Sequence, residues 1–230
     1  MNSPRARLVR LGLALLLIVP AAGPLAAEEA TTPEPLGIGF LYHTRSAQAA
    51  TRLTSQADFV DLILGGDKLA VFDAVRPPVR VACIALALER HEARPFPGVR
   101  ETIEMLRAAE VDPARVIIAY NPERSPGTTI AEIDDLLGSV QRAHAKAQAY
   151  GSPLLVGPGL RDMAQREELY PELAQHCEIW LIQSQRLQMD QATRELTTPE
   201  EYRAGVERIV RMLREGNPEI EVFVQIIAGG

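Results

Sequence analysis

Seven apolar, β-rich runs recur along this chain, and each one ends in polar or glycine-rich residues. The runs are Leu36–His43, Asp58–Gly66, Val79–Glu89, Arg115–Glu123, Pro153–Leu160, Glu178–Gln185 and Glu219–Gly230. Most intervals between them carry a helical pattern, and repeated strand–helix units are typical of a parallel sheet with helical crossovers. Eight such units close a β/α barrel. We therefore expect an α/β fold of the (β/α)8 TIM-barrel type, with seven recognisable strands and the eighth unit missing.

A doubly wound sheet of the flavodoxin or Rossmann kind is the main alternative fold. Such a sheet usually carries a glycine-rich phosphate loop after its first strand, and residues 40–45 (FLYHTR) contain no glycine. The fragment Gly157-Pro158-Gly159 is a poor substitute, because Pro158 lacks the amide hydrogen that would bind a phosphate. We interpret this fragment as a turn at the end of a strand.

The N-terminus has the pattern of a secretory signal peptide. Three arginines precede the apolar run Leu11–Val19, and small residues follow up to a predicted cleavage site after Ala27. The apolar run is too short to span a bilayer, so membrane attachment would come only from an uncleaved signal segment. We predict a signal peptide over residues 1–27, a flexible linker over 28–35, a single barrel domain over 36–230, and a secreted or periplasmic location.

The charge of the predicted mature chain is acidic. Removal of residues 1–27 lowers the number of Lys and Arg from 24 to 21 against 30 Asp and Glu, which gives a net charge of −9. This balance argues against nucleic acids and anionic membrane surfaces as partners.

The two cysteines are expected to be buried thiols without a disulfide. Cys83 lies in the third run and Cys177 directly precedes the sixth, and these two strands lie nearly opposite each other in a barrel.

Helix signals fill several of the intervals between strands. The spacing predicts helices over Gly98–Glu110, over Ile130–Tyr150 after a capping box at Thr129 and Glu132, and from Thr198 to about Arg214. Two intervals are less regular. Lys68–Val75 predicts only a short helical link, and Arg161–His176 contains Pro171, which predicts a broken helix.

In a parallel β/α barrel, ligands bind where the strands end. The fourth run closes with Tyr120, Asn121, Pro122 and Glu123, and the two-residue period of a strand puts Asn121 and Glu123 on one face. A carboxyl there suits a general acid/base, whereas the competing interpretation is a surface ion pair between Glu123 and Arg124. Other carboxyls near strand ends are Asp67, Glu89 and Asp162.

The other strand ends are rich in neutral polar groups. Gln183 and Gln185 close the sixth run on one face, Gln225 belongs to the seventh, and His43 ends the first. Amide groups both donate and accept hydrogen bonds and therefore suit hydroxyl-rich ligands, although they would also form a satisfied polar layer. No two histidines have the spacing of metal ligands. We predict substrate contacts from His43, Tyr120, Asn121, Gln183, Gln185 and Gln225, with no metal and no cofactor.

Four segments carry a resemblance to a known group of proteins: Val116–Glu123, Thr129–Glu132, Leu154–Pro158 and Ile179–Gln185. They look like exported, largely uncharacterised bacterial TIM-barrel proteins whose architecture is similar to that of glycoside hydrolases. Many glycosidase barrels place an Asn-Glu pair at the end of strand four, with Glu as acid/base, so the resemblance implies that role for Glu123. Here Pro122 separates the pair, and Gln225 stands where strand seven would usually supply a nucleophilic Glu.

These observations support two hypotheses of different classes. The first is an exported glycoside-hydrolase-like barrel that recognises a carbohydrate or polyhydroxylated ligand, with Glu123 as the acid/base if the protein also hydrolyses that ligand. The second is a non-catalytic binding or scaffold protein on the same barrel, because no second carboxyl is fixed beside Glu123. A cofactor enzyme of the doubly wound type is a third alternative.

Without an eighth unit the first and seventh strands have unpaired edges, which a homo-oligomer would cover.

Overall fold

The computed structural model describes residues 39–41, 51–54, 58–90, 96–124, 127–190, 193 and 195–225. Contacts divide the chain into residues 1–34 and residues 35–230, and all described residues belong to the second unit. The predicted signal peptide (1–27) and linker (28–35) therefore lie outside the described residues. Among the described helices, none combines the length and the apolar character needed to cross a membrane.

The fold is built on one parallel sheet whose strands follow each other in the order of the sequence. Its strands are β1 (Gly39–Leu41), β2 (Phe59–Leu62), β3 (Arg80–Ala85), β4 (Val116–Tyr120), β5 (Leu154–Val156), β6 (Ile179–Gln183) and β7 (Glu221–Gln225). Each strand pairs in parallel with the next one. Sequential order without a reversal is the topology of a β/α barrel, whereas a doubly wound sheet reverses its order at a switch point.

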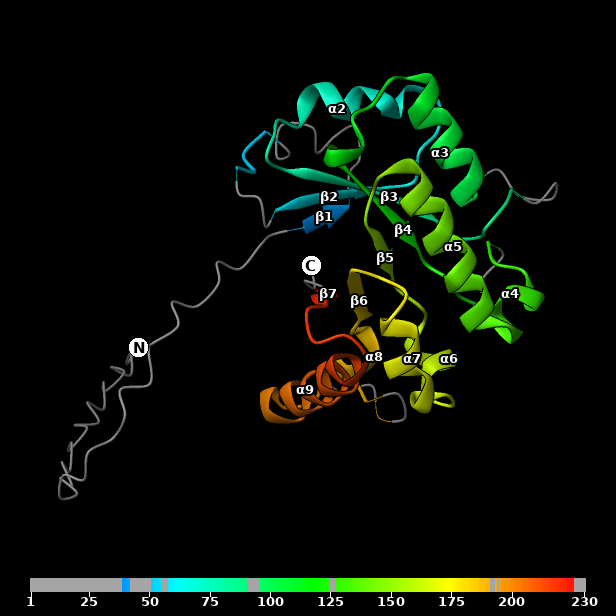
Figure 1. Cartoon of the computed structure of the whole chain (residues 1–230). Helices are drawn as coiled ribbons and strands as arrows, with labels where there is room; N and C mark the ends of the chain where they lie inside the picture. The colour runs from blue at the N-terminus through cyan, green and yellow to red at the C-terminus, as the bar shows by residue number, and fades with distance from the viewer. Residues whose placement is uncertain are drawn as a thin grey trace, which may run out of the picture. The chain divides into compact units, whose positions relative to one another are not determined.

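The sheet curls into half of a barrel (Figure 1). Six strands, β2–β7, form this curl, and β1 adds three residues that pair with β2. The expectation of an α/β barrel-like fold is confirmed at this level. The expectation of seven comparable strands is corrected, because the structure describes only Gly39–Leu41 of the first predicted run. Among the described strands, no ladder joins β7 to β1.

Helices cover the convex side of the sheet (Figure 1). They are η2 (Gly66–Ala70), α2 (Val71–Ala74), α3 (Val99–Ala108), η3 (Pro113–Arg115), α4 (Ile130–Asp134), α5 (Leu136–Tyr150), α6 (Leu160–Met163), η4 (Glu167–Leu169), α7 (Tyr170–Ala174), α8 (Gln185–Gln188) and α9 (Pro199–Gly216). The short link before β3, the helix α3 and the interrupted helix around Pro171 agree with the sequence-based expectations. So does α9, which the complete Thr198–Glu201 capping box begins.

The helix expected over Ile130–Tyr150 is instead two helices that meet at Asp135. Asp135 has φ −105° and ψ 58°, which ends α4, and its carboxylate accepts a hydrogen bond from the Gly138 amide at 3.2 Å to begin α5. Only half of the expected capping box forms at the start of α4. Thr129 accepts from the Glu132 amide, but the Glu132 carboxylate accepts from the Leu88 amide at 2.9 Å. A tertiary contact with the loop after β3 thus replaces a local one.

Strand side chains alternate between a convex-side core and a smaller concave-side cluster. The convex side packs under the helices, and the concave side holds Ala82, Ile117, Ala119, Leu155 and Ile179. Cys83 and Cys177 are both on the convex side and are free, buried thiols, as expected. Burial raises the pKa of both thiols well above its usual range, so neither is a reactive thiolate.

Two contacts cross the concave side between strands that are not neighbours in the sheet. The rings of Phe59 on β2 and Phe223 on β7 stack with centroids 4.2 Å apart and an interplanar angle of 7°. Arg80 on β3 donates through Nη2 to both carboxylate oxygens of Glu221 on β7, at 3.1 and 3.2 Å. Because β7 pairs only with β6 among the described strands, these contacts hold the two sides of the curl together.

The aromatic contact should contribute measurably to stability. We expect Phe223→Ala to lower the free energy of unfolding by about 2 kcal/mol, less than a fully buried Phe would cost because this ring is partly exposed. Urea denaturation followed by circular dichroism measures the change. Val224→Ala, on the other face of β7 with 39% of its surface exposed, is the matched control and should change stability by less than about 1 kcal/mol. Equal losses in both variants would contradict a bridging role for Phe223.

Candidate ligand site at the strand ends

The residues that follow the concave-side positions meet at the carboxyl ends of β4, β5 and β6. Asn121 comes two residues after Ala119, and Gly157 comes two residues after Leu155, so both continue the concave side of their strands. Gln183 is the last residue of β6 and lies two residues after Leu181. Because of this period, Asn121, Gly157 and Gln183 lie at the same end of the half-barrel, on its concave side.

Two hydrogen bonds donated by the Gln183 amide organise this end. Its Nε2 donates to Glu123 Oε1 at 2.7 Å and to the Gly157 carbonyl at 2.7 Å. Both amide hydrogens are thereby used, and the amide oxygen remains an acceptor. Glu123 and Gln183 are 60 residues apart in sequence, and the structure brings these two predicted site residues into direct contact.

The backbone of Glu123 is anchored from the neighbouring loop. Its amide donates to Thr128 Oγ1 at 3.0 Å, and that hydroxyl donates to the Leu86 carbonyl at 2.5 Å. Thr128 is 5% exposed. The sequence did not predict a role for Thr128, because a threonine directly before the helix cap at Thr129 looks like an ordinary loop residue.

Glu123 does not form the surface ion pair that was its alternative interpretation. Arg124 instead bonds Asp162, with Nε 2.8 Å from Oδ1, and the Arg124 amide donates to Oδ2 at 3.3 Å. The Asp162 side chain is 11% exposed, whereas the Arg124 side chain is 60% exposed. Among the described residues, the Glu123 carboxylate has Gln183 as its hydrogen-bond partner and no cation paired with it.

Asn121 brings a buried polar atom to the same place. The residue is 7% exposed, and its Oδ1 has no hydrogen-bond partner within the described part of the chain. A Cβ at Gly157 would lie 2.8 Å from this oxygen, so glycine is what leaves room beside it. A buried acceptor without a donor costs about 1–3 kcal/mol, which a ligand with a hydroxyl or amine donor would relieve.

Gly159 separates two acidic side chains. A Cβ at this position would lie 3.5 Å from Asp162 Oδ2 and 3.8 Å from Glu123 Cγ. The Asp162 carboxylate and the side-chain stem of Glu123 therefore border the space in front of Gly159. Sequence analysis named Asp162 among several acids near strand ends, and the structure places it beside Glu123.

Other predicted contact residues are placed differently. Tyr120 is fully buried on the convex side, because it is one residue away from Asn121 and so points in the opposite direction. Its pKa is raised by burial. Gln185 begins α8, so the strand period stops at Gln183 and the two glutamines do not share a strand face. His43 lies outside the described residues.

Gln225 is the register partner of Gln183 across the β6–β7 ladder. Its side chain is exposed, and its carbonyl accepts from the amide and hydroxyl of Ser184, at 3.2 and 2.6 Å. Ser184, which is fully buried and also lies 2.9 Å from the Tyr202 hydroxyl, fixes the end of β7 against α9. Gln225 thus lies next to Gln183 and extends the row of amides.

The chemistry of this site is that of hydrogen-bond acceptors. The acceptors are Asn121 Oδ1, the Gln183 amide oxygen, and the carboxylates of Glu123 and Asp162. Within the described ranges, no group of three His, Cys, Asp or Glu residues is placed to hold a metal ion. Acceptors of this kind match ligands that present several hydroxyl donors.

Comparison with known proteins did not identify a family for this chain. No protein-family model matches the chain, and no curated protein matches it.

Proposed function

We propose that this chain binds a carbohydrate or another polyhydroxylated ligand at the ends of β4, β5 and β6, as a glycoside-hydrolase-like barrel protein. The observation that carries the proposal is the 2.7 Å contact between Gln183 and Glu123, made beside the unpartnered Asn121 oxygen. Gln183 fixes the carboxylate in one orientation while leaving its own oxygen available to a ligand hydroxyl. The signal-like N-terminus supports a role outside the cytoplasm.

In the catalytic form of this proposal, Glu123 is the general acid/base. A glycosidase needs a second carboxyl at a set separation, and Asp162 across Gly159 is the group that the structure offers. The amide oxygen of Gln183 would hold a hydroxyl of the ligand next to the Glu123 carboxyl, because Gln183 contacts that carboxyl. Glu123 would then donate its proton to the oxygen of the leaving group.

A non-catalytic binding protein is the second candidate, and a separate observation favours it. Arg124 bonds Asp162 through both its side chain and its amide, so this carboxylate is already neutralised. Gln225, next to Gln183, supplies an amide instead of a further carboxylate. A site with one unpaired carboxylate can bind hydroxyl groups without cleaving a glycosidic bond.

The first test removes the central contact. We expect Gln183→Ala to weaken glycan binding by about tenfold, because it leaves Glu123 Oε1 and the Gly157 carbonyl without their donor. Glu123→Gln keeps the shape of the side chain and should abolish hydrolysis while changing affinity far less. A glycan array followed by calorimetry measures binding, and release of reducing sugar measures turnover.

Glu168→Gln is the matched control for Glu123→Gln, because Glu168 is exposed on η4. It should leave both binding and turnover unchanged. Turnover that disappears only in Glu123→Gln supports the catalytic form, and binding without turnover in the unmodified chain supports the second candidate. Unchanged binding in both Gln183→Ala and Glu123→Gln would reject the site.

The second test fills the space in front of Gly159. Its φ of −60° and ψ of 128° suit any residue, and the added methyl would sit at ordinary contact distance from Glu123 and Asp162. We therefore expect Gly159→Ala to fold with an unchanged melting temperature and to bind glycan at least about tenfold more weakly, because the methyl occupies ligand space. Gly65→Ala, where an added Cβ meets nothing within 4 Å, is the control. Full binding by folded Gly159→Ala would place the ligand elsewhere.

A further inference from the structure

A row of alternating charges runs along the exposed side of α9. Arg203, Glu207, Arg211 and Glu215 follow each other at intervals of four residues, so they form one ridge on the helix surface. All four are exposed. Within the part of the chain that the structure describes, none of their side chains forms a hydrogen bond or ion pair, whereas the Arg208 side chain on the same helix pairs with Glu167 at 2.7 Å.

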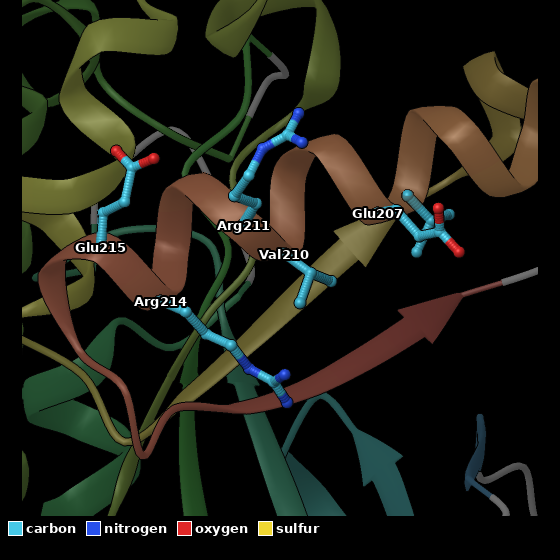
Figure 2. Close-up of a pocket in the computed structure, with 6 residues that line it drawn as sticks. Glu207, Val210, Arg211, Arg214 and Glu215 are labelled. Atoms are coloured by element: carbon cyan, nitrogen blue, oxygen red, sulfur yellow. The ribbon is translucent and has the colours of Figure 1, made fainter. Parts of the chain in front are cut away.

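An apolar groove lies beside this charged row. It has a volume of about 520 Å³ and is lined by Val206, Val210, Arg214 and three members of the row. Figure 2 shows Val210 between Glu207 and Arg214 on α9, above the strand β7. Both valines are partly exposed at the margin of the convex-side core, and Val224 on β7 is 39% exposed. This is the surface where the described sheet ends.

We propose that a second copy of this chain docks on this groove, with the two α9 helices antiparallel across a two-fold axis. An axis midway between Glu207 and Arg211 places Glu207 against the partner's Arg211. The same axis places Arg203 against the partner's Glu215. Every charge of the row thus meets its opposite, and symmetry repeats each pair.

The packing geometry of helices agrees with this arrangement. Ridges formed by residues four apart interdigitate when two helices cross at about 50°, the commonest class of helix packing. In that class the charged ridge of one copy lies along the ridge of the other. The charged row then occupies the centre of the contact, and Val210 of each copy lies beside it, where apolar contact adds to the interface.

Charge complementarity selects a second copy over other occupants. The four charges of the row cancel, so the surface does not favour a strongly acidic or strongly basic partner. A two-fold interface must be complementary to itself, and this alternating row satisfies the requirement when one copy is reversed about the midpoint of the row, whereas a shift of one turn would place like charges opposite each other. The row therefore specifies the register as well as the partner.

Charge reversal and its rescue test the proposal. Sedimentation velocity and light scattering would measure the mass of the purified chain, of Glu207→Arg, of Arg211→Glu and of the double variant. Each single reversal places like charges opposite each other twice and should raise the dimer dissociation constant by at least about tenfold. The double variant restores opposite charges across the axis and should dimerise like the unmodified chain.

Two further measurements separate assembly from folding. Glu168→Arg makes the same change of charge on an exposed residue outside α9 and should leave the dimer intact. Circular dichroism melts should show all variants folded. A monomeric unmodified chain at the highest soluble concentration would overturn the proposal, and so would single reversals that dimerise normally or a double variant that stays monomeric while folded.

Discussion

The contacts of β7 with β2 and β3 are the constraint on which the rest of this structure depends. A parallel sheet of this order needs only pairing between neighbours, and pairing alone does not fix how strongly it curls. The stack of Phe59 on Phe223 and the ion pair of Arg80 with Glu221 reach across the concave side and fix that curvature. Curvature in turn brings the ends of β4, β5 and β6 towards one another, which makes a shared site there achievable.

Strand positions could be predicted because their signal is local. The buried runs around β3 and β4 are nearly continuous apolar sequences, and the helical pattern between them leaves few alternatives to a parallel sheet. The extent of the curl could not be predicted, because it depends on side chains such as Arg80 and Glu221 that meet only in three dimensions. The incomplete capping box at Thr129 was missed for a similar reason. The Glu132 carboxylate satisfies the Leu88 amide in a loop 44 residues away instead of its own helix end.

In the candidate site, too, features that depend on neighbouring residues could be predicted from the sequence, and contacts between distant residues could not. Glu123 and Gln183, both predicted from the ends of strands, are in direct contact, and the two-residue period explains why Tyr120 points into the convex-side core. Gln185 was predicted one period too far, because α8 begins at that residue. Arg124 pairs with Asp162, so the Glu123 carboxylate is available to Gln183. This pairing could not be predicted from the sequence, because it depends on the position of the loop that carries Gly159.

The ion pair between Arg80 and Glu221 also bears on how the chain folds. Its two residues are 141 positions apart, so the contact closes a loop that contains most of the described domain. Contacts between such distant residues form late, because the loop they close costs entropy before any neighbouring contact repays it. We therefore expect the curved sheet to reach its full stability only once β7, the last of the described strands, has joined it.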